Sequence, residues 1–122
     1  MAVKEVSFGE IVEVTFKFPG EGYKVHPAVV VSTPDLQEDE FGMFYAVLIS
    51  SKNINPHYTI EIKNEWLTKP LPKKSYFITH FMTYFTPDEV SRKYNTSIRD
   101  EFMDDIICKN IKSIYGITLE ME

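Results

Sequence analysis

The stretch that decides the fold is Glu10–Phe18, which reads EIVEVTFKF, together with His26–Ser32, which reads HPAVVVS. The first segment alternates apolar and polar residues, and this period of two predicts a strand with one buried face. The second contains the continuous apolar run 28–31, which predicts a strand buried on both faces. Residues 19–22 read PGEG, so we expect a flexible loop that carries residues 23–25.

Further runs of β-branched and aromatic residues predict the rest of a sheet. Strands are expected at Met43–Ile49, Tyr58–Ile62, Ser75–Ile78 and Phe81–Phe85. The acid-rich stretch 35–40 is expected to be a loop between two of these strands.

The C-terminal part has a different periodicity. From Phe102 to Tyr115, apolar residues recur every three to four positions, which predicts one stripe of an amphipathic helix. Ser97 is the expected N-cap, with Asp100 three residues later, and Gly116 is the expected stop. Five or six short strands and one helix predict a mainly β or α+β fold, with the helix packed on a small bent antiparallel sheet.

Length and charge limit the classes of function. The 122 residues suit a single domain, which we place at 1–122. A net charge of −5 excludes a general nucleic-acid binder held by overall positive charge. Residues 50–75 nevertheless carry five lysines against two acids, which fits a polyanion, whereas 88–105 carry six acids against three basic residues. One cysteine, Cys108, and the lack of a long apolar run or signal-peptide segment predict a cytoplasmic protein.

In their order and spacing these segments resemble the PemK/MazF family of toxins. Gly9–Val14 (GEIVEV) and His26–Ser32 are similar to the family's opening strand and to its R-P-A-[LV]-V-[LIV]-S strand. Ala46–Ser51 (AVLISS) is similar to an apolar strand that ends in two hydroxyl residues, and 59–62 and 97–115 match the later strand and helix. The resemblance implies an SH3-like barrel of the PemK/CcdB type, usually a homodimer.

The activity that the resemblance implies is cleavage of single-stranded RNA by an mRNA-interferase-like endoribonuclease of the hydrolase class, without metal or cofactor, restrained by a cognate antitoxin protein. In such cleavage the substrate's 2′-hydroxyl attacks the phosphate and a cyclic phosphate results. The reaction needs a base, an acid and donors to the charged phosphate.

Two residues are the catalytic candidates. His26 stands where the family has an arginine, so a permanent charge is lost, but an imidazole suits acid–base work near neutral pH. Ser50 stands where the family has a hydroxyl that assists at the phosphate. A strand-opening histidine and a strand-end serine that satisfies the backbone are the structural alternatives.

Five residues are candidates for substrate binding. Tyr23 is expected to stack on a base, and Lys24 and Lys52 to supply charge. Ser51 follows Ser50 and is expected to assist it. His80 lies close to the position where the family has a second arginine, which this sequence lacks, and could partly replace it. An isolated Cys108 makes metal binding improbable, and we expect no metal site.

Two alternative functions remain open at the level of sequence. The loss of the arginine and the acidic net charge fit a toxin-like binding module without catalysis, with a protein or nucleic-acid partner. A gyrase poison on the same scaffold is the third hypothesis, since a fold does not fix a target. The sequence does not reveal the cut site, the antitoxin or the oligomeric state.

Overall fold

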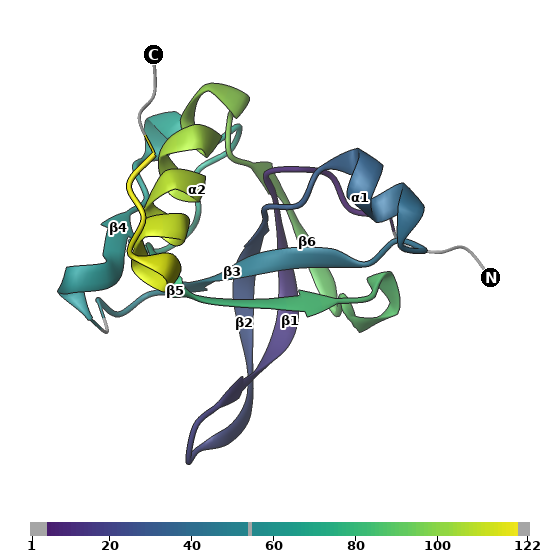
Figure 1. Ribbon diagram of the computed structural model, residues 1–122, viewed down its shortest axis with the longest axis horizontal. Helices are drawn as coiled ribbons and strands as arrows, with labels where there is room; N and C mark the ends of the chain where they lie inside the picture. Colours follow the sequence, from purple (N-terminus) through teal and green to yellow (C-terminus); the bar gives the residue numbers. More distant parts are fainter. Residues whose placement is uncertain (1–4, 54, 120–122) are drawn as a thin grey trace.

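The computed structural model describes residues 5–53 and 55–119, and its six strands form one antiparallel sheet in the order β4-β5-β3-β2-β1-β6. The strands are β1 (Glu10–Phe18), β2 (Gly22–Val30), β3 (Phe44–Ser50), β4 (Thr59–Glu61), β5 (Tyr76–Phe85) and β6 (Arg92–Ser97). The helices are α1 (Pro34–Asp39) and α2 (Asp100–Tyr115), and the short 3₁₀ turns are η1 (Pro56–Tyr58), η2 (Asn64–Trp66) and η3 (Pro87–Glu89). The predicted antiparallel sheet with a C-terminal helix is confirmed (Figure 1).

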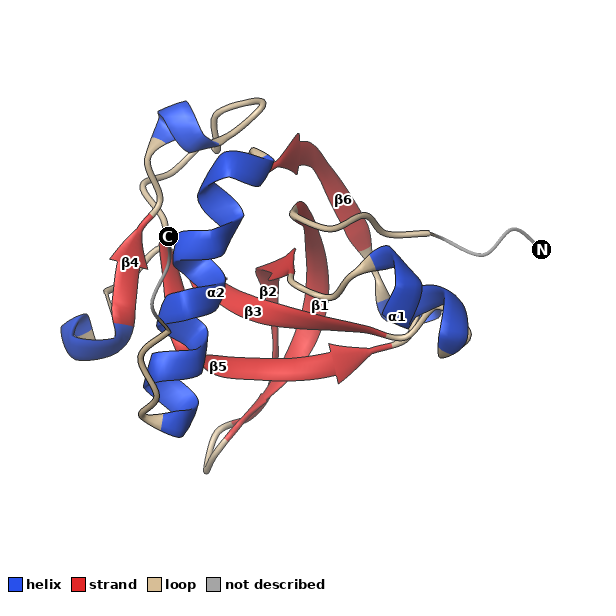
Figure 2. Cartoon of the chain, turned by 45° about the horizontal axis from the view of Figure 1, so that its top comes forward, coloured by secondary structure: helices blue, strands red, loops and turns tan. Residues whose placement is uncertain are grey.

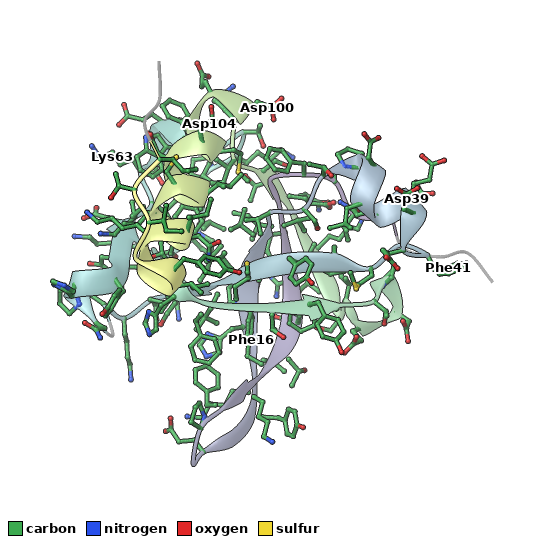
Figure 3. The ribbon with its side chains drawn as sticks, in the orientation of Figure 1. Phe16, Asp39, Phe41, Lys63, Asp100 and Asp104 are labelled. Carbon is green, nitrogen blue, oxygen red and sulfur yellow. The ribbon has the colours of Figure 1, made fainter. Side chains whose placement is uncertain are left out.

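The sheet bends around one apolar cluster and carries a second on its other face. The first, here called the inner cluster, is built from alternate residues of β1, β2 and β3, with Ile78 and Phe85 of β5. Phe16, labelled in Figure 3, belongs to it. Its ring packs edge-on against Phe81 and Phe85, with centroids 5.7 and 5.3 Å away.

The second, here called the outer cluster, lies between the sheet and α2. It joins strand residues of the opposite parity, such as Val29 and Val47, to Met103 and Ile106 of the helix. Figure 2 shows α2 at one end of the sheet and α1 at the other. Because one face of each strand is covered by each cluster, β2 and β3 are fully buried where they pair.

The edges of the sheet approach each other through the loop after β4. The Thr68 N–H donates to the Ser97 carbonyl at 2.9 Å, and Leu67 forms an isolated antiparallel bridge with Ile98. The Thr96 hydroxyl also accepts from the Lys69 N–H at 3.0 Å. This closure gives the sheet a barrel-like form.

The expected loop over 23–25 is wrong. Gly20 and Gly22 adopt φ values of +75° and +81°, and this tight turn lets the ladder run to the pair Phe18–Gly22. Residues 23–25 therefore belong to β2 and pair with β1, and the long hairpin projects from the body of the molecule (Figure 1). Consequently His26 lies within a strand, whereas the sequence predicted a position at the end of a loop.

Three other expectations are corrected. The acid-rich stretch 35–40 is mostly helical, because Thr33 caps α1 by accepting from the Leu36 N–H at 3.3 Å and Pro34 starts the helix. Ser97 ends β6 and pairs with Glu10, so the N-cap of α2 is Arg99. The two predicted strands within 75–85 are one strand, β5, whose pairing with β3 shifts between Val47 and Ile49. Gly116 caps α2 with a φ of +70°, as expected.

Candidate functional site

His26 lies at the boundary between the exposed and the buried part of β2. Residues 22–25 are exposed, His26 and Pro27 are half-buried, and 28–30 are fully buried. On one side His26 pairs with Val14 of β1. On the other side, the β2–β3 ladder ends at Ala28–Leu48, two residues before His26. His26 contacts Ile49, the residue before Ser50, so the two catalytic candidates lie on neighbouring strands.

A hydrogen bond fixes the histidine ring against β3. Pro27, the next residue of β2, has no N–H to donate to β3. The His26 Nδ1 atom lies 3.3 Å from the Ile49 carbonyl oxygen, which only accepts, so Nδ1 carries the proton of this bond. In the neutral ring Nε2 is then unprotonated and able to accept a proton, as a general base must.

Aromatic rings connect His26 to the other candidate histidine. The ring of Phe18 lies 5.3 Å from that of His26 and 5.0 Å from that of Phe81, measured between centroids. His80 follows, with its ring 6.3 Å from Phe81 and 4.9 Å from Tyr58. We call Phe18, His26, Phe81, His80 and Tyr58 the aromatic strip. Rings at such distances form favourable contacts, and exposed members offer π-faces to unpaired bases.

The candidates at the hairpin tip are exposed. Tyr23 has 71% of its surface exposed, which suits a stacking residue. The Lys24 ammonium lies 3.2 Å from a carboxylate oxygen of Glu21 and 5.5 Å from the centroid of Phe18. Lys24 thus approaches the aromatic strip at the end where His26 lies, although Glu21 partly balances its charge.

The candidates after β3 differ in accessibility. Ser50 is 4% exposed, and its hydroxyl oxygen accepts from the Lys52 N–H at 3.1 Å. That contact caps the strand end and leaves the hydroxyl proton for donation. Ser51 and Lys52 are exposed beside it.

Some neighbours of the site could not be assigned a place from the sequence. Phe18 and Phe81 link the two histidines, although their runs of apolar residues indicate nothing more than strand core. Tyr76 pairs with Ser50 across β5 and β3 and packs on the inner cluster. These contacts depend on strand register, which no local motif in this sequence encodes.

Other chemical groups lie outside this region. Burial, reinforced by the hydrogen bond that its hydroxyl donates to Glu13, raises the pKa of Tyr94 on β6. Within residues 5–53 and 55–119, no group of three or more histidine, cysteine or acidic side chains is arranged to hold a metal ion. In the same residues, no helix has the length and apolar character needed to cross a membrane.

Comparison with solved structures identifies the fold. The chain superposes on an endoribonuclease in complex with its cognate antitoxin from Mycobacterial species, with a TM-score of 0.67 and 13% identity over 94% of this chain and 99% of that chain. MazF (Form-I) from Deinococcus radiodurans gives a TM-score of 0.71 at 13% identity, covering 93% of this chain and 98% of the other. The MazE-MazF structure (Form-III) from the same organism gives 0.66 at 13% identity, over 93% and 98%.

The protein therefore has the MazF-like toxin fold that the sequence resemblance implies. Neither the protein-family models nor the curated proteins gave a match to the sequence.

Proposed function

We propose that this protein is a toxin-like endoribonuclease that cleaves single-stranded RNA without a metal ion and is restrained by a cognate antitoxin. The observation that carries the proposal is His26, held through Nδ1 on the Ile49 carbonyl with Nε2 left to accept a proton. It lies in a fold shared with proteins described as endoribonucleases, one of them bound to its antitoxin.

In the proposed reaction His26 Nε2 takes the proton of the substrate's 2′-hydroxyl. The 2′-oxygen then bonds to phosphorus, the bond from phosphorus to the 5′-oxygen breaks, and that oxygen takes a proton from water, while the proton held on His26 returns to solvent. The products are a 2′,3′-cyclic phosphate and a 5′-hydroxyl end. Ser50 donates its hydroxyl proton to a phosphate oxygen, and Lys24 and Lys52 balance the charge. Tyr23, Ser51 and His80 contact the flanking nucleotides.

A binding module without catalysis is the second candidate, and one observation favours it. Ser50 is 4% exposed and its hydroxyl oxygen already accepts from the backbone of its own strand end, which limits the access of a phosphate to this side chain. This function would use the same surface for a partner without turnover.

The test uses two substitutions that separate the roles of the two imidazole nitrogens. His26→Asn keeps a side-chain N–H where Nδ1 lies and removes Nε2, whereas His26→Ala removes both. Purified proteins are incubated with a long unstructured RNA in EDTA, and the 5′ ends are mapped. Loss of a general base lowers rates by about 10²–10⁴-fold, so we expect both variants to lose discrete cuts while His26→Asn stays folded. His57→Ala, at an exposed histidine in η1, is the control and should cleave normally.

The outcomes decide between the candidates. Cleavage retained by His26→Asn means that the imidazole has a structural role and that catalysis lies elsewhere. No cuts by the folded wild-type protein, with tight binding of a partner, would establish the binding module.

A further inference from the structure

A pocket lies between two loops, apart from the catalytic candidates. A cavity of about 620 Å³ opens between residues 61–67 and 71–75. Such a volume falls in the range of small-molecule sites, about 300–1,000 Å³. Lys63, Lys73 and Lys74 line it together with two glutamates, Glu61 and Glu65. The pocket is thus rimmed by three of the five lysines in the basic stretch 50–75.

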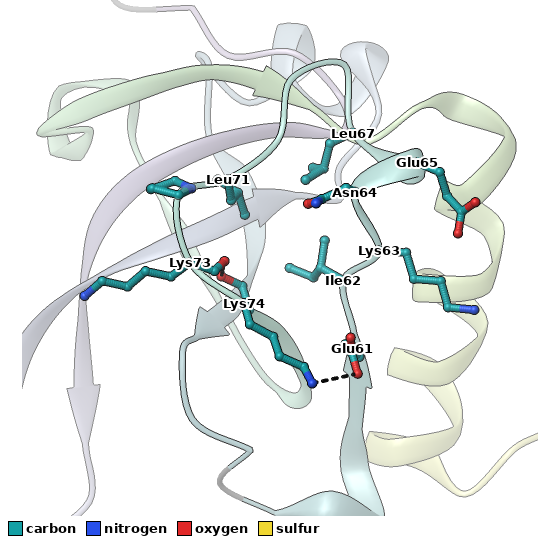
Figure 4. Close-up of a pocket in the computed structure, with 11 residues that line it drawn as sticks. Glu61, Ile62, Lys63, Asn64, Glu65, Leu67, Leu71, Lys73 and Lys74 are labelled. Carbon is teal, nitrogen blue, oxygen red and sulfur yellow. Dashed lines mark hydrogen bonds and ion pairs between the residues drawn. The ribbon is translucent and has the colours of Figure 1, made fainter.

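The floor of this pocket is apolar. Ile62, Leu67 and Leu71 line it and pack in or against the outer cluster. Figure 4 shows their side chains directed into the opening, with Lys63 and Lys73 on opposite sides of it. A planar base against an apolar floor, with a phosphate near a lysine rim, is the combination that a nucleotide requires.

Strand register connects the pocket to the catalytic candidates. Ser50 pairs with Tyr76, and Tyr76 pairs with Glu61. From Ser50 to Glu61 this row crosses two neighbouring strand gaps of about 4.7–4.9 Å each, or about 10 Å in total, and His26 lies on the next strand, bonded to the carbonyl of Ile49 beside Ser50. This span exceeds one nucleotide and suits a strand that continues past the cleaved phosphate.

Lys74, which forms an ion pair with Glu61 at the end of this row, is easily released from that pair. The Lys74 ammonium lies 3.6 Å from a carboxylate oxygen of Glu61 (Figure 4), and their side chains are 64% and 51% exposed. An exposed pair of this kind contributes little stability, so a phosphate can replace the carboxylate at small cost.

Resting on the proposed function, we infer that this pocket is a second RNA-binding subsite. It takes a nucleotide that flanks the scissile phosphate, with the base over Leu71 and the backbone phosphate at Lys73 and Lys74. The subsite strengthens the binding of longer strands and takes no part in bond cleavage.

The test compares a double variant with a matched control. Lys73→Ala/Lys74→Ala removes two charges from the rim, and Lys109→Ala/Lys112→Ala removes two charges from α2. Binding of fluorescent single-stranded RNA of ten nucleotides is measured by anisotropy in the His26→Ala background, so that cleavage does not interfere. We expect the rim variant to raise the Kd on the order of tenfold and to lower the salt slope of log Kd by about 0.7 per lysine.

Substrate length supplies the second readout. A dinucleotide covers the His26 region without reaching the pocket, so its Kd should be the same in both double variants. If the rim variant binds ten nucleotides as tightly as the control does, the subsite is wrong. An equal loss of RNA affinity in both double variants would also overturn the proposal, because it would show that overall charge, and not this pocket, determines binding. Lysine-dependent binding by a wild-type protein that cuts no RNA would instead refute the proposed function and leave this subsite standing.

Discussion

The two halves of the β1–β2 hairpin have the same strands and different surroundings. In the base half, β6 pairs with β1 at Glu10–Glu13 and β3 pairs with β2 at Ala28–Val30, so both strands of the hairpin have a further neighbour in the sheet. In the tip half, where 15–18 pair with 22–25, no third strand pairs with the ribbon among the described residues. The base is therefore paired on both sides. In the tip, Phe16 and Phe18 of β1 still pack in the inner cluster, whereas residues 22–25 of β2 are exposed, and His26 lies where the two halves meet.

The largest expected effect is on the base. Ile11 is fully buried in the outer cluster, so Ile11→Ala removes apolar contacts and leaves a cavity. We expect the free energy of unfolding to fall by about 2–5 kcal/mol, measured by urea denaturation. Val25→Ala is the control at the tip, where the side chain is 54% exposed, and should stay within about 0.5 kcal/mol. Equal losses at both positions would mean that the tip is packed on something that the single chain does not show.

A smaller effect is expected where the two strands of the tip turn. Gly22 has a φ of +81°, and a Cβ added there meets nothing within 4 Å, so any cost of Gly22→Ala is backbone strain. Left-handed backbone costs an alanine about 1–2 kcal/mol, whereas asparagine tolerates it better. We expect Gly22→Ala to speed hydrogen exchange at the amides of 15–18 and Gly22→Asn to do so less.

The amides of the base decide what this result means. If exchange at Ile11–Val14 accelerates as much as at the tip, the hairpin opens as one unit, and the division into halves is wrong. If exchange there is unchanged, the tip opens locally, as elements with few buried contacts do.

The same division explains what the sequence could and could not predict. In the base, alternation in β1 and the apolar run of β2 predict strands, because burial there leaves a strong pattern. In the tip, β2 reads GYKV, with no apolar face, and the strand exists because two glycines permit a tight turn. A pattern of burial cannot reveal a strand that is not buried.

The sequence predicted which residues form the candidate site better than it predicted how they are arranged. A local motif indicated His26, and Ser50 followed from the end of an apolar strand. The bond from His26 to the Ile49 carbonyl spans 23 positions in the sequence and depends on the register of β2 against β3. The ring contacts of Phe18 with Phe81 and of His80 with Tyr58 likewise join distant segments. The capping prediction at Ser97 failed for a related reason, since pairing with Glu10 keeps that residue in β6.

The smallest expected effect concerns the ion pair at the tip. Substitutions there should leave the stability of the fold nearly unchanged while they alter RNA binding. Lys24 and Glu21 are 48% and 61% exposed on their side chains, and an exposed pair of this kind adds little stability. We expect Lys24→Ala and Glu21→Gln each to change the free energy of unfolding by less than about 0.5 kcal/mol.

On RNA binding, under the proposed function, the same two substitutions should act in opposite directions. Lys24→Ala removes a charge beside the aromatic strip and should weaken binding of single-stranded RNA, whereas Glu21→Gln removes the carboxylate that competes with phosphate and should strengthen it. Anisotropy titrations at two salt concentrations measure both, and the difference between the variants should shrink as salt rises. If both substitutions weaken binding, the intact pair positions the tip. If neither changes binding, the RNA does not reach the tip, and its contacts are confined to the boundary at His26 and beyond.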